Sequence, residues 1–171
     1  MSLLSKLFGA KPDDRAALRP LWHRVVEIAR EPQWYSRGAI ADTLEGRFDA
    51  ITLVLALVLL RMEREAELIA PSVRLTELFV EDMDSQLRES GVGDLVVGKK
   101  IGKLMSVLGG RLGAYRDALA TDGNELAEAV SRNVNLTEGA SPALVAAEMR
   151  IIAGQLEAVP AATLLAGEIA R

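Results

Sequence analysis

The chain has 171 residues, of which 50% are apolar and 26% are charged, and it contains no cysteine. A single domain of this length buries about 70% of the surface of its unfolded chain, so it needs neither disulfides nor a structural metal to fold. The net charge of −4 differs from the positive excess typical of proteins that bind DNA. The lack of cysteine excludes a disulfide framework, a thiolate nucleophile and cysteine-ligated zinc.

Leucine and alanine make up a large part of the chain, with 26 and 25 residues respectively, and both are strong helix formers. Apolar residues recur at helical spacing, whereas no alternating strand pattern of useful length is present. The sequence therefore predicts an all-α fold, a single-domain bundle of about six to seven helices. We assign this domain to residues 13–171 and expect residues 1–12 to form a flexible or amphipathic tail.

The bounds of the predicted helices follow from apolar spacing and from capping residues. Pro32 stops the first helix, and residues 33–46 form an irregular connection after it. Ser72 is expected to cap the third helix, Gly91 to supply its left-handed end, and Asp94 to cap the fourth. In chain order the predicted helices span about 13–30, 48–67, 72–91, 95–120, 122–133 or 124–133, and 141–158, with a short last helix after Pro160.

The second predicted helix contains the longest apolar run, AITLVLALVLL at residues 50–60, between Asp49 and Arg61. Eleven helical residues span only about 16 Å, which is well short of the roughly 30 Å of hydrocarbon in a bilayer. A helix that is apolar on all sides and too short for a membrane is typical of the middle of a bundle. We therefore expect this helix to be the buried centre of the fold.

The fourth predicted helix contains several interior glycines, each of which costs about 1 kcal/mol relative to alanine. Such a cluster indicates that another helix approaches closely or that the helix is kinked. The glycines are Gly102, Gly109, Gly110 and Gly113.

Apolar residues in the tail would share one face of a helix, with Lys6 and Lys11 available for acidic lipid headgroups. Charged residues follow at once, so the tail lacks the apolar region and cleavage site of an export signal. We expect a cytoplasmic protein, whose tail either frays, docks on the domain or makes peripheral contact with the inner membrane. The apolar tail residues are Leu3, Leu4, Leu7 and Phe8.

Residues that support catalysis are scarce, and the sequence predicts no cofactor. His23 is the only histidine, and its position beside Trp22 on an amphipathic helix is more typical of a boundary residue than of a general base. Asp82, Asp84 and Asp94 leave open a metal-dependent enzyme, although a solvated helix face explains the same acidic residues.

Charge is segregated along the chain. Residues 77–94 contain six acidic residues and one basic residue, whereas residues 95–116 contain five basic residues and no acidic one. The two segments either pair with each other in the fold or present a bipolar surface to a partner. In the second case the basic residues of 99–116 would contact a ribosome or an anionic membrane surface.

Three segments in the central third of the chain carry a family resemblance. They read DTLEGRFD at 42–49, FVEDMD at 79–84, and LRESGVGDL with KKI between 87 and 101. In this order they resemble the ubiquinol–cytochrome c chaperone family, the assembly factors of respiratory complex III. The resemblance covers about residues 20–120, and we assign no family motif to the last fifty residues. Gly98 stands where the family tends to have proline, and the apolar helix has only aliphatic residues around Leu55, where the family often has a histidine.

The resemblance implies an all-helical, non-enzymatic chaperone. Mitochondrial members bind newly made cytochrome b near the ribosomal tunnel exit, together with a small partner protein. The first twenty residues lack the character of a mitochondrial presequence, because they include Asp13 and Asp14 and only two arginines. A bacterial member of the family is therefore expected, with cytochrome b or another membrane protein as its client.

The partner-binding residues that we predict come from the family motifs and from the basic segment. A regulatory helical adaptor that binds a soluble protein through the same residues remains an alternative to the chaperone. The predicted residues are Arg47, Phe48, Asp82, Asp84, Arg88, Gly91, Gly93, Asp94, Lys99, Lys100 and Lys103.

Overall fold

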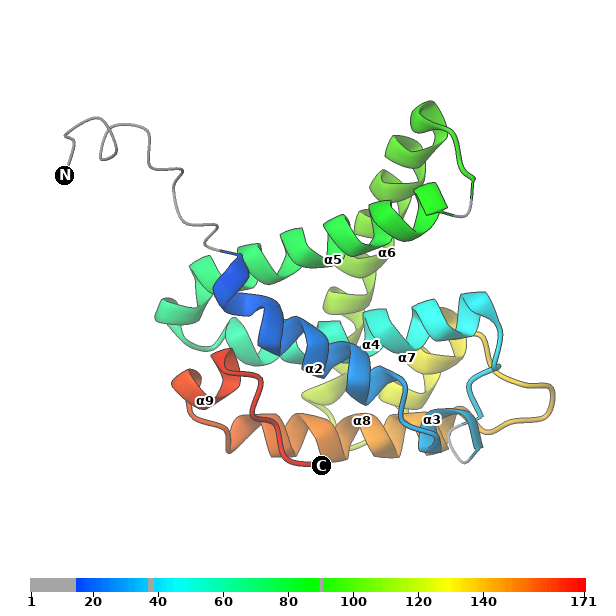
Figure 1. Cartoon of the computed structure of the whole chain (residues 1–171). Coiled ribbons are helices and arrows are strands. Elements are labelled where there is room, and N and C mark those ends of the chain that lie inside the picture. Colours follow the sequence, from blue (N-terminus) through cyan, green and yellow to red (C-terminus); the bar gives the residue numbers. More distant parts are fainter. Residues whose placement is uncertain (1–14, 37–38, 90) are drawn as a thin grey trace.

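The computed structural model describes residues 15–36, 39–89 and 91–171, so the predicted tail lies outside the described residues. The described residues form helices joined by short connections (Figure 1), with one isolated antiparallel bridge between Ile40 and Leu136. This confirms the predicted all-α class. The helices are η1 (Ala16–Leu18), α2 (Arg19–Ala29), α3 (Gln33–Ser36), α4 (Leu44–Met62), η2 (Ala66–Leu68), α5 (Ile69–Glu89), α6 (Asp94–Leu119), α7 (Glu125–Asn133), α8 (Pro142–Glu157) and α9 (Ala161–Leu165).

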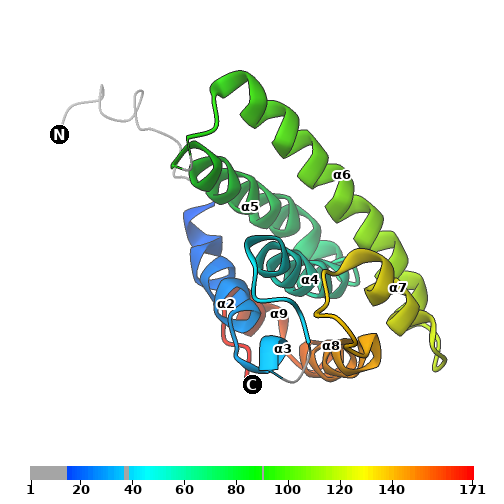
Figure 2. The same ribbon diagram turned by 90° about the vertical axis from the view of Figure 1, so that its right-hand side faces the viewer.

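Helix α4 is the centre of the fold, as the apolar run predicts. Every residue from Asp49 to Leu59 is buried, and α4 packs against α2, α5, α6 and α8. Figure 2 shows α4 nearly end-on, with these helices arranged around it. Among the described residues, no helix combines the length and the apolar character that crossing a membrane requires.

Arg61, which follows the apolar run, forms hydrogen bonds with the backbone at the carboxyl end of α8. The buried guanidinium of Arg61 donates from Nε to the Leu156 carbonyl at 2.9 Å and from Nη2 to the Val159 carbonyl at 3.0 Å, and it also pairs with Glu65. A buried charge needs such partners because an unpaired one costs several kcal/mol. Arg61 therefore fixes the position of α8 beside α4.

The start of α4 differs from the prediction. The helix begins at Leu44 rather than near Phe48, and the Thr43 hydroxyl caps it by accepting a hydrogen bond from the Gly46 amide at 3.1 Å. The preceding chain folds back so closely that a Cβ on Gly46 would lie 1.9 Å from the Ala41 carbonyl oxygen. The predicted irregular connection therefore includes both α3 and the first turn of α4.

The boundary between α4 and α5 also differs from the prediction. Helix α4 ends at Met62, and α5 begins at Ile69, two residues before Pro71. Proline is tolerated in the first turn of a helix because the amide that it lacks would have no partner there. Ser72 is consequently inside α5 rather than at its cap, and its hydroxyl donates to the Ile69 carbonyl at 2.8 Å.

The prediction that a helix packs closely on the glycines of α6 is wrong for the described residues. Helix α6 continues without a break through all four positions. A Cβ built on any of these glycines would meet nothing within 4 Å. Glycine content alone does not indicate which side of a helix a residue lies on, so the sequence could not separate packed glycines from exposed ones.

Candidate functional site

Helices α5 and α6 form a hairpin that projects beyond the other helices (Figure 1). Gly91 in its loop has φ of +81°, which confirms the predicted left-handed turn and explains the glycine. Gly93 is the N-cap residue of α6 and Asp94 is the first residue of the helix, so Asp94 does not act as the predicted cap.

Arg88 holds the two sides of this hairpin together. Its Nε donates to Asp84 at 2.6 Å, and its Nη1 donates to Asp94 across the loop. These hydrogen bonds raise the pKa of Arg88 above its ordinary value, with the Asp84 bond contributing most. The family motif at 79–94 therefore contains a charged clamp that joins the end of α5 to the start of α6.

Asp82 does not join this clamp. Its carboxylate accepts a hydrogen bond from Gln86 at 3.2 Å, and it lines a shallow cavity beside α2 that also includes the exposed side chain of His23. Within the described ranges, no cluster of three or more histidine, aspartate or glutamate side chains is placed to hold a metal. The metal-dependent alternative thus finds no ligand set in Asp82, Asp84 and Asp94, because Arg88 pairs with two of them.

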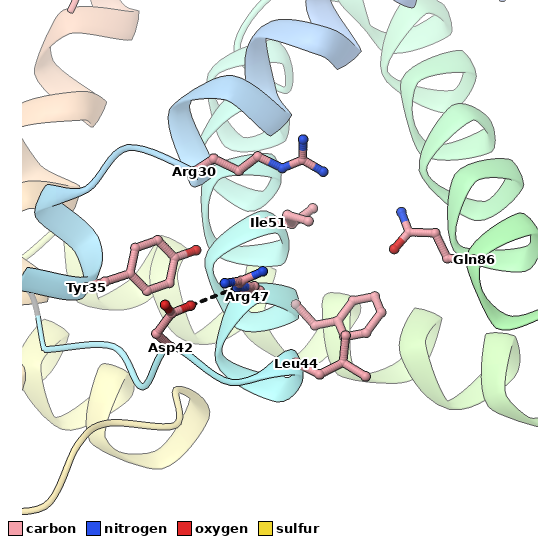
Figure 3. Close-up of a pocket in the computed structure, with 8 residues that line it drawn as sticks. Arg30, Tyr35, Asp42, Leu44, Arg47, Ile51 and Gln86 are labelled. Carbon is pink, nitrogen blue, oxygen red and sulfur yellow. Dashed lines mark hydrogen bonds and ion pairs between the residues drawn. The ribbon is translucent and has the colours of Figure 1, made fainter. Parts of the chain in front are cut away.

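Arg47 and Phe48 line a second cavity, of about 440 Å³. Figure 3 shows Tyr35 and Arg30 on one side of this cavity and Gln86 of α5 on the other. The Arg47 Nε donates to Asp42 at 2.7 Å, and this hydrogen bond lowers the pKa of Asp42.

The phenol of Tyr35 also lines this second cavity. It donates to the Ala29 carbonyl at 2.9 Å, and partial burial raises its pKa. The DTLEGRFD motif thus builds a capped helix start and a polar cavity wall.

A groove between α5 and α6 is the largest of the described cavities, at about 730 Å³. Acidic residues lie along its rim, but each has an arginine partner: Glu63 pairs with Arg116 at 2.8 Å, and Asp84 with Arg88 at 2.6 Å. Glu77 and Glu81 are paired in the same way, with Arg74 and Arg15 respectively. Because the acidic residues are paired, the groove presents mainly an apolar surface to any ligand. Its apolar walls are formed by Leu59, Val73, Val80, Ile101, Met105 and Leu112.

The basic segment 95–116 divides into two sets in the structure. Arg116 pairs with Glu63 across the rim of the groove, and Arg111 is buried, so neither is available for a basic surface. Lys99, Lys100 and Lys103 are exposed, and they form no ion pair with any described residue. The partners of Arg111 and Arg116 are Asp49 and Glu63, which lie outside the acidic segment 77–94, so these ion pairs do not join the acidic segment to the basic one as the first alternative expected. A contact of the lysines with a partner remains a prediction.

Sequence reasoning missed the polar centre formed by Asp49, Arg111 and Asn135. Arg111 on α6 donates to the Asp49 carboxylate on α4 and also bonds the Thr52 hydroxyl. The other Asp49 oxygen accepts from the Asn135 amide at 2.8 Å and from its side chain at 2.6 Å. In the sequence Asp49 is the last residue of the DTLEGRFD segment and a charge next to an apolar run, and neither feature indicates its partners. Its partners lie 62 and 86 residues away.

The described residues form a helical bundle with a large apolar groove at one side, and the acidic residues on the rim of that groove are paired with arginines. Comparison with known proteins gives the family. Residues 36–171 match the family model for the ubiquinol-cytochrome C chaperone, and the chain belongs to this family. Membership of a chaperone family implies a binding function rather than catalysis.

A solved structure supports the assignment. The crystal structure of the Cbp3 homolog from Brucella abortus is similar to this chain at 30% identity, with a TM-score of 0.79. The similarity covers 99% of this chain and 96% of the other. None of the curated proteins matches the chain significantly. The family match reaches Arg171, so the resemblance that we placed at about 20–120 extends through the last fifty residues.

Proposed function

We propose that the protein binds newly made cytochrome b, or a related membrane client, during assembly of the ubiquinol–cytochrome c reductase complex. The observation that carries this proposal is the family match over residues 36–171, which includes both helices that form the α5–α6 groove. The client remains bound without chemical turnover and leaves when it is assembled.

We assign the client to the α5–α6 groove because its walls are apolar and its rim is neutralised by ion pairs. A segment of a membrane protein that has not yet reached its final place exposes apolar side chains, and burying these contributes about 25 cal/mol per Å². A groove of about 730 Å³ accommodates several such side chains. The ion pairs along the rim keep the empty groove compatible with water.

Affinity purification from detergent-solubilised membranes tests this proposal. The wild-type chain should recover cytochrome b, and Val73→Glu should lose it, because Val73 is 53% exposed within the groove. Ile151→Glu is the matched control, since Ile151 has the same exposed fraction on α8. Recovery of a soluble protein alone would favour a regulatory adaptor, and equal recovery by both variants would place the client elsewhere.

A further inference from the structure

The outer face of α6 begins with two exposed apolar side chains. Leu95 is 96% exposed and Val96 is 49% exposed, and both belong to the first turn of α6. This turn follows the loop of the α5–α6 hairpin, which projects beyond the other helices (Figure 1). A single exposed leucine is ordinary on a protein surface. An exposed leucine and an exposed valine next to each other, at the projecting end of a hairpin, form an apolar surface that another surface can contact without obstruction.

Three lysines lie on the same face of the helix. At 100° per residue, Leu95, Val96, Lys99, Lys100 and Lys103 fall within an arc of about 140°. On the opposite face of α6, Val97 and Leu108 are buried against the bundle. We call the five exposed residues the hairpin tip.

Acidic residues do not offset this positive charge on α6. No acidic residue occurs between 95 and 116. Around the loop of the hairpin, Asp84 and Asp94 are both bonded to Arg88, and Glu89 at the end of α5 accepts a hydrogen bond from the Ser85 hydroxyl at 3.3 Å. The lysines themselves have no ion-pair partner in the part of the chain that the structure describes. The hairpin tip therefore combines an apolar pair with a cluster of unneutralised positive charge.

We propose that the hairpin tip docks on an anionic lipid surface, with Leu95 and Val96 among the acyl chains and the lysines at the headgroups. Lysine near an anionic leaflet is attracted electrostatically, and adjacent apolar side chains add burial at the boundary. An RNA backbone would satisfy the lysines equally well but gives no reason for the exposed apolar pair. This contact is independent of which client the α5–α6 groove holds.

The absence of native cysteine permits a direct test with the full chain. An environment-sensitive dye on Leu95→Cys should become brighter and shift to the blue with vesicles of phosphatidylcholine containing about 30% phosphatidylglycerol. The same dye on Ile151→Cys should not respond, nor should either protein with pure phosphatidylcholine. Equal responses at the two positions, or none at Leu95→Cys, would overturn the proposal.

Sedimentation with the same vesicles tests the contribution of the lysines and that of the apolar pair separately. Changing Lys99, Lys100 and Lys103 to glutamate should weaken vesicle binding at least about tenfold. This loss should be smaller at high salt, because salt screens the charges. Leu95→Ser with Val96→Ser should weaken it about fivefold. The matched control is Leu144→Ser with Ile151→Ser, two apolar residues of α8 that are each 53% exposed, and it should bind as the wild type does. Thermal unfolding of each variant checks that the fold is retained.

Two other results would overturn the proposal. Binding of the wild type to purified ribosomes but not to vesicles, lost on reversal of the lysines and unaffected by the Leu95 and Val96 changes, would assign the lysines to RNA. Vesicle binding that is abolished by Leu4→Ser with Leu7→Ser, yet unchanged by every variant of the hairpin tip, would assign membrane contact to the amino-terminal segment.

Discussion

The Arg111 guanidinium bonds the Asp49 carboxylate between α6 and α4, and both side chains are at least nine-tenths buried. This pair connects the long outer helix to the centre of the bundle. Through Asn135, Asp49 also holds the connection that follows α7. The base of the α5–α6 hairpin is therefore anchored by a polar contact rather than by apolar packing alone.

Removing Arg111 should destabilise the fold strongly. We expect Arg111→Leu to lower the free energy of unfolding by about 3–5 kcal/mol, because the buried Asp49 carboxyl would lose its cationic partner and keep only its hydrogen bonds from Asn135. Arg116→Leu should cost at most about 1 kcal/mol, because its pair with Glu63 is half exposed. Urea unfolding measures both. Asp49→Asn should restore part of the stability of Arg111→Leu; if the two losses simply add, the charged pair is not the cause.

Glycines 46 and 102 should respond in opposite directions to alanine. Gly46→Ala places a Cβ against the Ala41 carbonyl, and we expect a loss of about 2 kcal/mol or more through strain at the start of α4. Gly102→Ala meets open space on an exposed helix face and should gain up to about 1 kcal/mol through helix propensity. Thermal unfolding distinguishes the two, and a lower melting temperature for Gly102→Ala would contradict the exposed position.

Features of the fold that depend on local sequence could be predicted, whereas contacts between distant residues could not. Periodicity places the apolar helix 50–60 at the centre of the bundle, because only a fully enclosed helix is apolar on every side. The turn at Gly91 follows from local chemistry. The pair of Asp49 and Arg111 could not be predicted, because it joins residues far apart in the chain whose charges alone are typical of a surface.

The family motifs predicted residues for the candidate site, but few of the contacts among them. Arg88 contacts Asp84 and Asp94, as their proximity in the sequence permits. Arg47 and Asp82 line separate cavities, which residue order alone does not reveal. The α5–α6 groove was not predicted, because its walls come from two helices whose relative angle depends on tertiary packing.

Tyr115 should make stability fall at alkaline pH. Its hydroxyl is buried with no hydrogen-bond partner among the described residues, and burial raises its pKa to about 12. The phenol of the unfolded chain ionises near pH 10. Between about pH 10 and 12 the folded chain therefore keeps a proton that the unfolded chain has lost. The stabilisation is therefore complete below about pH 10 and is lost as the pH rises toward 12.

Tyr115→Phe isolates this contribution. At pH 7 we expect an unchanged free energy of unfolding, or a gain of about 1 kcal/mol, because an unsatisfied buried hydroxyl is removed. Between about pH 9 and 11 the variant should lose less stability than the wild type. Urea unfolding at these pH values measures the difference. A loss of more than about 1 kcal/mol at pH 7 would indicate that the hydroxyl has a stabilising partner.

Hydrogen bonding to Arg47 should keep the Asp42 carboxyl ionised at lower pH than an ordinary aspartate. Titration by nuclear magnetic resonance should show a pKa below the usual range in the wild type. In Arg47→Gln, which lacks the charge, the pKa should rise toward the ordinary value. The folded-state pKa is depressed, so any contribution to stability is present above the unfolded pKa and is lost as the pH falls through the folded value. An unchanged pKa in Arg47→Gln would mean that the hydrogen bond does not form in solution.

The central claim is that the α5–α6 groove holds a segment of cytochrome b, and site-specific photo-crosslinking in membranes tests it most directly. A photoreactive residue at Val73, on the groove wall, should yield a crosslink to cytochrome b. The same residue at Ile151, which is equally exposed on α8, should not. Crosslinks to cytochrome b from Ile151 alone, or from neither position while the two proteins still co-purify, would contradict the claim.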